Sequence, residues 1–592
     1  MPSPATCRHA EPAERIAAQR AVIARFEAAL WDGGFNENLL ASYQSAWRRL
    51  EGLLESRDDA LRHHFVIVIP VADSPVHLKN CLASLLDLCR AYGYGGEQDG
   101  RWRKVSLLLA DDSGDAASIA RNRAIADDFE QQGIATHYFG LAEQLALMDR
   151  FEGLDLTPIV GNHARDAFHH KGQAMMRNIA YLKCAELAQT LPDARLLFYT
   201  IDADQAFKVN VETPDGPREV MAVNYLAVLD AIFSENDAQI LTGKVVGDPP
   251  VSPAVMAGNF LEDVIAFLRE MAVVSPADAY LQPGCASTGD AAYHDMADLF
   301  GFQRRAAAYR YRCAAGAPGA PNNAACFNEF AGRLNRFFHG EHPTRVTGYE
   351  YAEVMPGMSP ARTVYTGNYV FRPEALDWFI PFAPLRLRMS GPTMGRMLQA
   401  EIGARFVSAN VPMLHKRTLD NTGQSEFRPG VVDESANQRV DLCGEFERQF
   451  HGDVMLFSMQ RLAAQGYPGI TLAAEVVDET LRVQQVEMRA TYRAKQLAIL
   501  DRLVQLKALL GDGAHWWNRS GSFDAELRNF QAFADNIERN FGAASSCFAH
   551  IDDPARRADW RARQLAAITG FHANRQVWAA ALARLQRPRS AD

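Results

Sequence analysis

Two aspartates separated by one residue follow a strongly apolar segment of the chain. The segment 196–201 is rich in aliphatic and aromatic residues, and it is followed by Asp202 and Asp204. Such a run predicts a buried strand, with both carboxylates at or just past its carboxyl end. Open α/β sheets bind ligands at that edge, and carboxylate oxygens are hard ligands for Mg²⁺ or Mn²⁺, which commonly bridge to nucleotide phosphates. Because aspartates also cap helices and occupy turns, the pair alone leaves a structural role open.

Two earlier apolar runs predict strands of the same kind. The segment 65–70 reads as a buried strand that leads into a helix starting at Pro75, and the segment 105–110 ends at Asp111 and Asp112. A proline at the first helical position marks the helix start. If the strands are parallel, their carboxyl ends line one crevice with acidic residues from two sides. The alternative is that Asp111 and Asp112 cap the next helix.

Cations and a glycine occur together between these acidic positions. The segment 169–180 has a helical pattern, with Lys171 and Gly172 near its start and Arg177 further along. Glycine permits a close backbone approach, and the cations could meet a diphosphate or a base edge. The alternative is an ordinary solvated helix face.

Taken in order, these motifs resemble a known family. A Val-Ile-Val-Ile-Pro-Val strand, an Asp-Asp-Ser after the next strand, a Lys-Gly…Arg-Asn helix and a strand leading to Asp-Ala-Asp occur in this order in GT-A fold glycosyltransferases, and family 2-like enzymes are the most similar. The resemblance covers about residues 61–260 and extends more weakly to about residue 425. It implies an α/β fold, a Rossmann-like mixed sheet of the nucleotide-diphospho-sugar transferase type, with helical additions at both ends.

The resemblance also implies roles for individual residues. Asp202 and Asp204 would be the catalytic pair, carrying ribose and metal contacts, with Mn²⁺ or Mg²⁺ as the ion. Either Asp111 or Asp112 would contact the base of a UDP- or GDP-sugar. The residues implied in binding the nucleotide-sugar are Pro70, Asp111, Asp112, Lys171, Arg177, Asn178, Asp202, Gly367 and Asn368.

The chain departs from the family pattern at the helix that resembles the acceptor-side helix, residues 390–406. Inverting members carry an acidic pair at its start, which deprotonates the acceptor hydroxyl, but this chain has Gly391 and Pro392 there. Neither residue can accept a proton. Either Glu350, Glu353 or Asp377 supplies the base, or the enzyme retains the anomeric configuration and needs none.

A histidine supports the retaining alternative. Some retaining GT-A enzymes place a histidine after the catalytic sheet as a third metal ligand, beside the two aspartates, and His415 fits that placement. Neutral imidazole is a suitable ligand for Mn²⁺. A lone histidine after an apolar run is also compatible with a packed or surface position.

Three classes of function follow. The first is a metal-dependent glycosyltransferase that moves a sugar from a nucleotide-diphosphate donor to a hydroxyl acceptor. The second is a sugar-nucleotide pyrophosphorylase, which the lack of a glycine-rich loop at residues 70–74 disfavours, and the third is a catalytically silent scaffold or binding protein. An anionic acceptor is conceivable because arginines cluster in one segment, although such clusters also form solvated helix faces: Arg304, Arg305, Arg310 and Arg312.

The length and periodicity of the chain predict three regions. With 592 residues, 48% of them hydrophobic, the chain can bury a large core and form more than one domain. We predict an N-terminal helical segment at 1–60, a catalytic domain at 61–430 with an insertion at 281–345, and a C-terminal helical domain at 440–592. The C-terminal helices would support the catalytic domain or form a contact in a homo-oligomer.

Charge and hydropathy restrict the partners and the location. The formal charge of −10 argues against broad nucleic-acid binding, which requires a basic footprint. No run of about 18 apolar residues predicts a membrane span, and the N-terminus does not resemble a secretory signal. We therefore expect a cytoplasmic enzyme. The nine cysteines are odd in number and scattered, so we expect reduced thiols, including Cys313 and Cys326, which flank a short loop.

Overall fold

The computed structural model defines most of the chain. It describes residues 12–32, 35–54, 61–191, 195–213, 216–283, 309–313, 321–417, 430–434, 439–519 and 521–586. In this part of the chain, no helix is long and apolar enough to cross a membrane.

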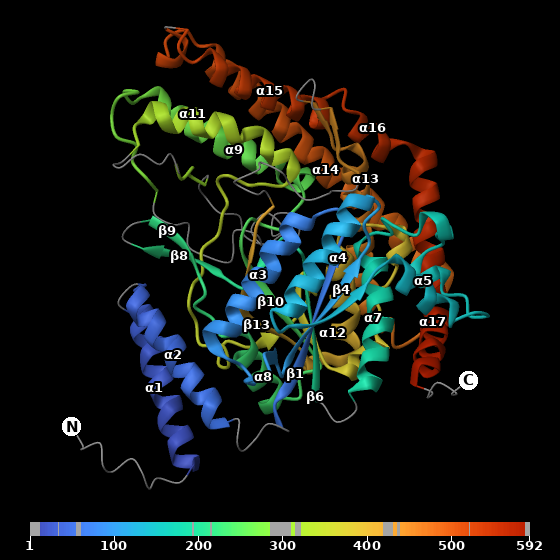
Figure 1. The fold of residues 1–592 in the computed structure, drawn as a ribbon. Coiled ribbons are helices and arrows are strands. Elements are labelled where there is room, and N and C mark those ends of the chain that lie inside the picture. Colours follow the sequence, from blue (N-terminus) through green and yellow to red (C-terminus); the bar gives the residue numbers. More distant parts are fainter. Residues whose placement is uncertain are drawn as a thin grey trace.

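A mixed sheet forms the centre of the fold (Figure 1). Its strands are ordered β11-β13-β10-β12-β6-β1-β4-β5, and β7 pairs with β13. Their bounds are β1 His63–Val71, β4 Val105–Asp111, β5 Ala135–Phe139, β6 Arg195–Ile201, β7 Gln205–Ala206, β10 Ile240–Gly247, β11 Ser359–Pro360, β12 Asn368–Phe371 and β13 Phe406–His415. The strands predicted from the three apolar runs are confirmed as β1, β4 and β6.

The direction of the strands brings the predicted site residues to one edge. β1 pairs in parallel with β4 and β6, and β4 pairs in parallel with β5. β12 is antiparallel to both β6 and β10, and β10 is parallel to β13, so β6, β10 and β13 share one direction. The carboxyl ends of β1, β4, β6, β10 and β13 therefore meet at the same edge. The strand order also reverses at β1, because β4 and β5 lie on one side of it and β6 on the other.

Helices cover both faces of the sheet. One face packs against α3 (Pro75–Tyr92), α4 (Ala116–Gln131), α8 (Tyr225–Glu235) and the N-terminal helices α1 (Pro12–Asp32) and α2 (Glu37–Leu54). The other face packs against α7 (Gln173–Thr190), α9 (Pro253–Ala272), α11 (Asn323–Arg333) and α12 (Ser390–Ile402). The predicted α/β class is thus confirmed at the level of class.

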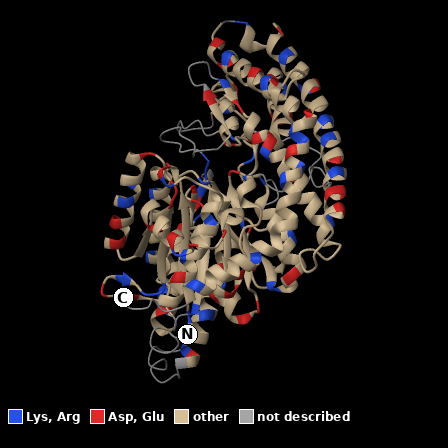
Figure 2. Cartoon of the chain, turned by 90° about the vertical axis from the view of Figure 1, so that its right-hand side faces the viewer, with Lys and Arg blue, Asp and Glu red and all other residues tan. Residues whose placement is uncertain are grey.

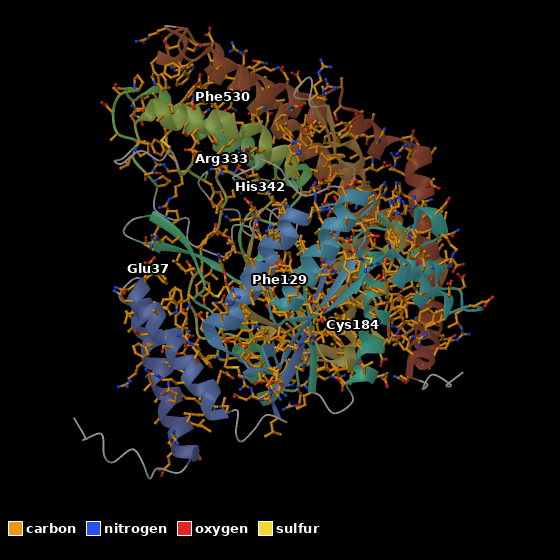
Figure 3. All side chains as sticks on the ribbon, viewed as in Figure 1. Glu37, Phe129, Cys184, Arg333, His342 and Phe530 are labelled. Atoms are coloured by element: carbon orange, nitrogen blue, oxygen red, sulfur yellow. A yellow bond between two sulfur atoms is a disulfide. The ribbon has the colours of Figure 1, made fainter. Side chains whose placement is uncertain are left out.

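The C-terminal helices extend the second of these layers. They are α13 (Cys443–Ala463), α14 (Ala474–Gly511), α15 (Asp524–Phe541), α16 (Ser546–Asp552) and α17 (Pro554–Gln586). Their apolar side chains belong to the same buried cluster as α7 and the sheet. Figure 3 shows Phe530 of α15 and Arg333 of α11 in this outer helical layer, and Cys184 of α7 beside the sheet. Acidic and basic residues are interspersed along the long C-terminal helices (Figure 2).

The remaining elements are short or lie at the periphery. They are the helices α5 (Leu141–Asp149) and α6 (Thr157–Val160), and the two-stranded sheets β2 (Glu97–Gln98) with β3 (Arg101–Trp102), β8 (Val209–Thr213) with β9 (Gly216–Val220), and β14 (Val432–Glu434) with β15 (Arg439–Asp441).

The expectation for one cysteine pair is wrong. Cys313 and Cys326 form a disulfide bond. Tyr280 donates a hydrogen bond to the carbonyl oxygen of Tyr311, and the Gln282 side chain bonds both the amide and the carbonyl oxygen of Cys313. The backbone next to Cys313 is thus fixed by residues about thirty positions earlier in the chain, and sequence spacing does not reveal such contacts. The cysteines at 81, 89, 184, 443 and 547 are free and buried.

Candidate functional site

A cleft of about 800 Å³ opens at the carboxyl edge of the sheet. It is lined by the turn after β1, Asp112, the start of α7 and the turn containing Asp202 and Asp204. The lining also includes residues 359–366, residues 383–392 and the start of α13. The cleft therefore lies at the switch point of the sheet, where α/β proteins of this kind bind their ligands.

Asp204 lines this cleft and contacts His415, which lies behind it and does not line the cleft. The Nε2 atom of His415 lies 3.0 Å from Oδ2 of Asp204, and both side chains are 1% exposed. The other ring nitrogen, Nδ1, lies 2.6 Å from the carbonyl oxygen of Asp248, which can only accept a hydrogen bond. Burial opposes a charge on His415, but the Asp204 carboxylate outweighs it and raises the pKa of His415 above its ordinary value. The Arg417 guanidinium lies 3.4 Å from the same carboxylate and lines the cleft.

Asp202 faces a different partner. Its carboxylate forms an ion pair with Arg177, a fully buried side chain of α7, and its amide donates a 3.0 Å hydrogen bond to Gln205. Gly367 closes the other side, because a Cβ at this position would overlap the Asp202 carboxylate. The structure thus brings Asp202, Arg177 and Gly367 together, whereas Asp204 pairs with His415 and Arg417.

Asp112 and Lys171 form a second buried ion pair at the cleft. The Lys171 ammonium contacts the Asp112 carboxylate, and the Lys171 amide donates to the same carboxylate at 2.8 Å. Burial raises the pKa of Asp112 and lowers that of Lys171, while the charge of each partner opposes these shifts. Asp112 lines the cleft, and Lys171 lies behind it, two residues before α7 begins at Gln173.

Asp111 and Asp112 have different surroundings. Asp111 accepts hydrogen bonds from the Ser113 amide at 2.9 Å, from Asn122 at 3.1 Å and from the Tyr138 hydroxyl at 2.7 Å. It therefore braces β4, α4 and β5 against one another, and Asp112 is the member that faces the cleft. Neither caps the next helix, because the residue that does so is Asp115.

Two residues predicted to bind the donor, Asn178 and Asn368, instead bond backbone groups of the protein. Asn178 donates to the carbonyl oxygens of Ile159 and Ile380, and accepts from the Ile380 amide at 2.8 Å. Asn368 donates to the carbonyl oxygens of Lys244 and Val411, at the position where the register of β10 and β13 shifts.

The remaining predicted donor residue lies at the cleft. Pro70, the second-last residue of β1, lines the cleft. Asn368, in contrast, is 1% exposed and its side chain is engaged with backbone groups and the Tyr199 hydroxyl.

Backbone strain is concentrated around the cleft. Of the six non-glycine residues with positive φ in the described chain, His170, Arg386 and Met389 line the cleft, and Asp73 lies between Ala72 and Ser74, which line it. His170 bonds the Asp73 carboxylate, which also accepts from the Gly114 amide at 3.1 Å and the Asp115 amide at 3.0 Å. Strained conformations of this kind persist where the surroundings over-determine them, and they cluster at functional sites.

The predicted base candidates lie outside the cleft. Glu350, Glu353 and Asp377 are exposed, and none of them lines the cleft in the described structure. At the start of α12, a Cβ on Gly391 would overlap the carbonyl oxygen of Val364, so the helix packs directly on the backbone at this point. That close approach leaves no room for a side chain at position 391.

The cleft also contains residues that the sequence interpretation missed. Glu445, in the first turn of α13, is 2% exposed, lines the cleft and accepts a 2.6 Å hydrogen bond from Ser252. The cleft is also lined by Arg362, Arg386, Arg388 and Arg448. These residues come from segments far apart in the sequence, so spacing carries no signal for them.

The arginine cluster predicted from the sequence has other partners. Arg310 pairs with Glu270 at 3.0 Å, and Arg312 pairs with Glu212. Arg304 and Arg305 lie outside the described residues. The described members therefore form surface ion pairs.

The side chains of Asp204 and His415 are suitable ligands for a divalent ion that also binds phosphate oxygens. Asp204 supplies a carboxylate and His415 an imidazole nitrogen, and the Asp248 carbonyl orients the ring, as the outer shell of metal sites commonly does. Within the described residues, no group of three or more His, Cys, Asp and Glu side chains is arranged to hold a metal ion. Mn²⁺ and Mg²⁺ fit such a site, because they are commonly bound by one or two protein ligands, water and substrate phosphates.

The sequence was compared with protein-family models and with curated proteins. No protein-family model matches the chain, and no curated protein matches its sequence.

Proposed function

We propose that the protein is a metal-dependent glycosyltransferase that moves a sugar from a nucleotide-diphosphate donor to a hydroxyl acceptor. The observation that carries the proposal is Asp204, which pairs with the buried His415 and lines the cleft together with Asp112, Asp202 and Arg417. The reversal of strand order at β1 supports nucleotide binding at this edge. The cleft volume of about 800 Å³ is in the range of sites for a ligand of this size.

In this proposal, different residues bind the metal ion, the phosphates, the ribose and the base. Asp204 and His415 would hold Mn²⁺ or Mg²⁺, which neutralises charge developing on the diphosphate leaving group. Arg417, beside Asp204, supplies a guanidinium suited to the phosphate oxygens. Asp202, fixed by Arg177, presents its second oxygen to a ribose hydroxyl, and Asp112 accepts from the base.

We also propose that the reaction retains the anomeric configuration. Gly391 leaves no room for a carboxylate at the start of α12, and the three acidic candidates from the sequence are exposed outside the cleft. A general base must lie within hydrogen-bond reach of the proton that it removes. Proton NMR of the first product formed identifies its anomer directly: an anomer like that of the donor supports retention, and the opposite anomer refutes it.

A thermal-shift screen tests the function itself. The wild type is heated with UDP-, GDP-, ADP- and TDP-sugars, with and without Mn²⁺, beside Asp204→Asn and the exposed control Asp377→Asn. A ligand that binds only the native state raises the melting temperature by mass action. The proposal predicts a shift for one nucleotide class that requires Mn²⁺, is lost in Asp204→Asn and is kept in Asp377→Asn. No shift for any donor, or an equal shift in Asp204→Asn, contradicts it.

A further inference from the structure

A group of arginines lines the cleft. We call Arg362, Arg386, Arg388 and Arg448 the arginine wall. Among the described residues, the acidic ones that line the cleft are Asp112, Asp202, Asp204 and Glu445. The first three pair with Lys171, Arg177 and His415.

Two members of the arginine wall have uncompensated guanidinium groups. In the described part of the chain, the side chains of Arg386 and Arg388 make no hydrogen bond and no ion pair. Asp453 lies near Arg388, but its carboxylate is bound by Gln449 at 2.8 Å and by Tyr492 at 2.5 Å.

The backbone holds these guanidinium groups on one surface. Arg448 Nε donates to the carbonyl oxygen of Arg386, and the Arg388 amide donates to the carbonyl oxygen of Arg448. Arg386 has a φ of 52° and Met389 a φ of 67°, so the segment between them is held in a conformation that costs free energy. Converging like charges on a strained segment are unfavourable unless an anion binds there.

A buried cation behind the wall strengthens the positive potential. Arg396 of α12 is 9% exposed and donates to the carbonyl oxygen of Arg362, without a carboxylate partner in the described structure. Burial, with a further contribution from the charge of Arg362, lowers the pKa of Arg396 to about 10. Its guanidinium is therefore still charged at neutral pH.

We propose that the acceptor carries an anionic group, a carboxylate or a phosphate, and that Arg386 and Arg388 bind it. The inference rests on the proposed function and assigns the substrate class of the same cleft. Guanidinium groups match both anions through paired N–H donors. Binding the anion at the wall would hold the acceptor in the same cleft as the proposed donor residues, where its hydroxyl can meet the sugar.

Calorimetric titration with small anions tests this proposal without knowledge of the acceptor. The titrants are inorganic phosphate and malonate at constant ionic strength, with neutral glycerol as the blank. The proteins are the wild type, the double variant Arg386→Gln/Arg388→Gln, and Arg405→Gln, an exposed arginine that does not line the cleft. We expect saturable binding of at least one anion to the wild type and to Arg405→Gln, with at least a tenfold loss in the double variant. The anion that binds more tightly identifies phosphate or carboxylate as the preferred group.

A second titration separates this proposal from the proposed function. UDP and GDP with Mn²⁺ are titrated into the double variant and into Asp204→Asn. Loss of nucleotide binding only in Asp204→Asn, with loss of anion binding only in the double variant, supports both proposals. Equal anion binding in wild type and double variant, or no saturable binding of either anion to the wild type, overturns the anionic acceptor even if nucleotide binding persists.

Discussion

His415 Nε2 and Asp204 Oδ2 lie 3.0 Å apart at the ends of two strands that are distant in the sequence. The Asp248 carbonyl oxygen can only accept a hydrogen bond, so the hydrogen on Nδ1 points to it. The Asp204 carboxylate raises the pKa of His415, which favours a proton on Nε2 between the two side chains. Asp204 and its second partner, Arg417, line the cleft.

The buried Lys171–Asp112 pair should be important for stability. Lys171 is 0% exposed, so Lys171→Met leaves the Asp112 carboxylate buried and uncompensated. We expect the unfolding free energy to fall by roughly 3–5 kcal/mol, as for other buried pairs that lose one partner. Urea unfolding followed by circular dichroism measures the loss.

The double variant Lys171→Met/Asp112→Asn provides the control. It carries no unpaired charge, so it should recover part of the lost stability. Equal destabilisation in the single and the double variant would show that packing, and not the unpaired carboxylate, determines the effect.

Gly391 should tolerate no side chain. In Gly391→Ala the new methyl group must displace the Val364 carbonyl or the start of α12, and we expect a loss of roughly 1–3 kcal/mol. Gly332→Ala in α11 is the matched control, because no atom lies within 4 Å of its added Cβ. It should be neutral or more stable by up to ~1 kcal/mol. Thermal unfolding of the two variants side by side tests the contrast, which disappears if α12 can shift without cost.

Asp453 should make stability depend on pH. Burial raises the pKa of Asp453 to about 7, despite the hydrogen bonds from Tyr492 and Gln449. The folded state therefore keeps a proton that the unfolded state releases near pH 4, so the contribution of this group is greatest below pH 4 and is lost as the pH rises through about 7. The asparagine of Asp453→Asn does not titrate.

The measurement is the difference in unfolding free energy between wild type and Asp453→Asn at several pH values. We expect the wild type to lose stability relative to the variant between pH 4 and pH 8, by up to about 4 kcal/mol for a shift of about three pKa units. Asp501→Asn, an exposed position on α14, should show no such trend. A difference that is constant with pH would mean that Asp453 has an ordinary pKa.

The sequence predicts the strands of the site well. It does not predict the arginine wall or Glu445. The runs that became β1, β4 and β6 are apolar because both faces of the sheet are covered, so the pattern alone located the edge at which Asp112, Asp202 and Asp204 lie. The long C-terminal helices are likewise evident from their apolar periodicity.

The roles of single side chains could not be predicted in the same way. Asp111 and Asp112 are adjacent and chemically identical, and only the positions of Asn122 and Tyr138 decide which of them faces the cleft. The arginine wall and Glu445 meet through contacts between residues 383–392 and α13, which no local pattern encodes. The Cys313–Cys326 bond was missed for the same reason.

Titration of Mn²⁺ in the presence of the bound nucleoside diphosphate tests the central claim most directly. Calorimetry is carried out on the wild type, Asp204→Asn, His415→Gln and the exposed control Asp377→Asn. The account predicts one saturable site in the wild type and in the control, weakened by at least roughly tenfold to a hundredfold in each of the other two, since even outer residues of metal sites have effects of this size. Unchanged Mn²⁺ affinity in both Asp204→Asn and His415→Gln would contradict the assignment of this pair as the metal site.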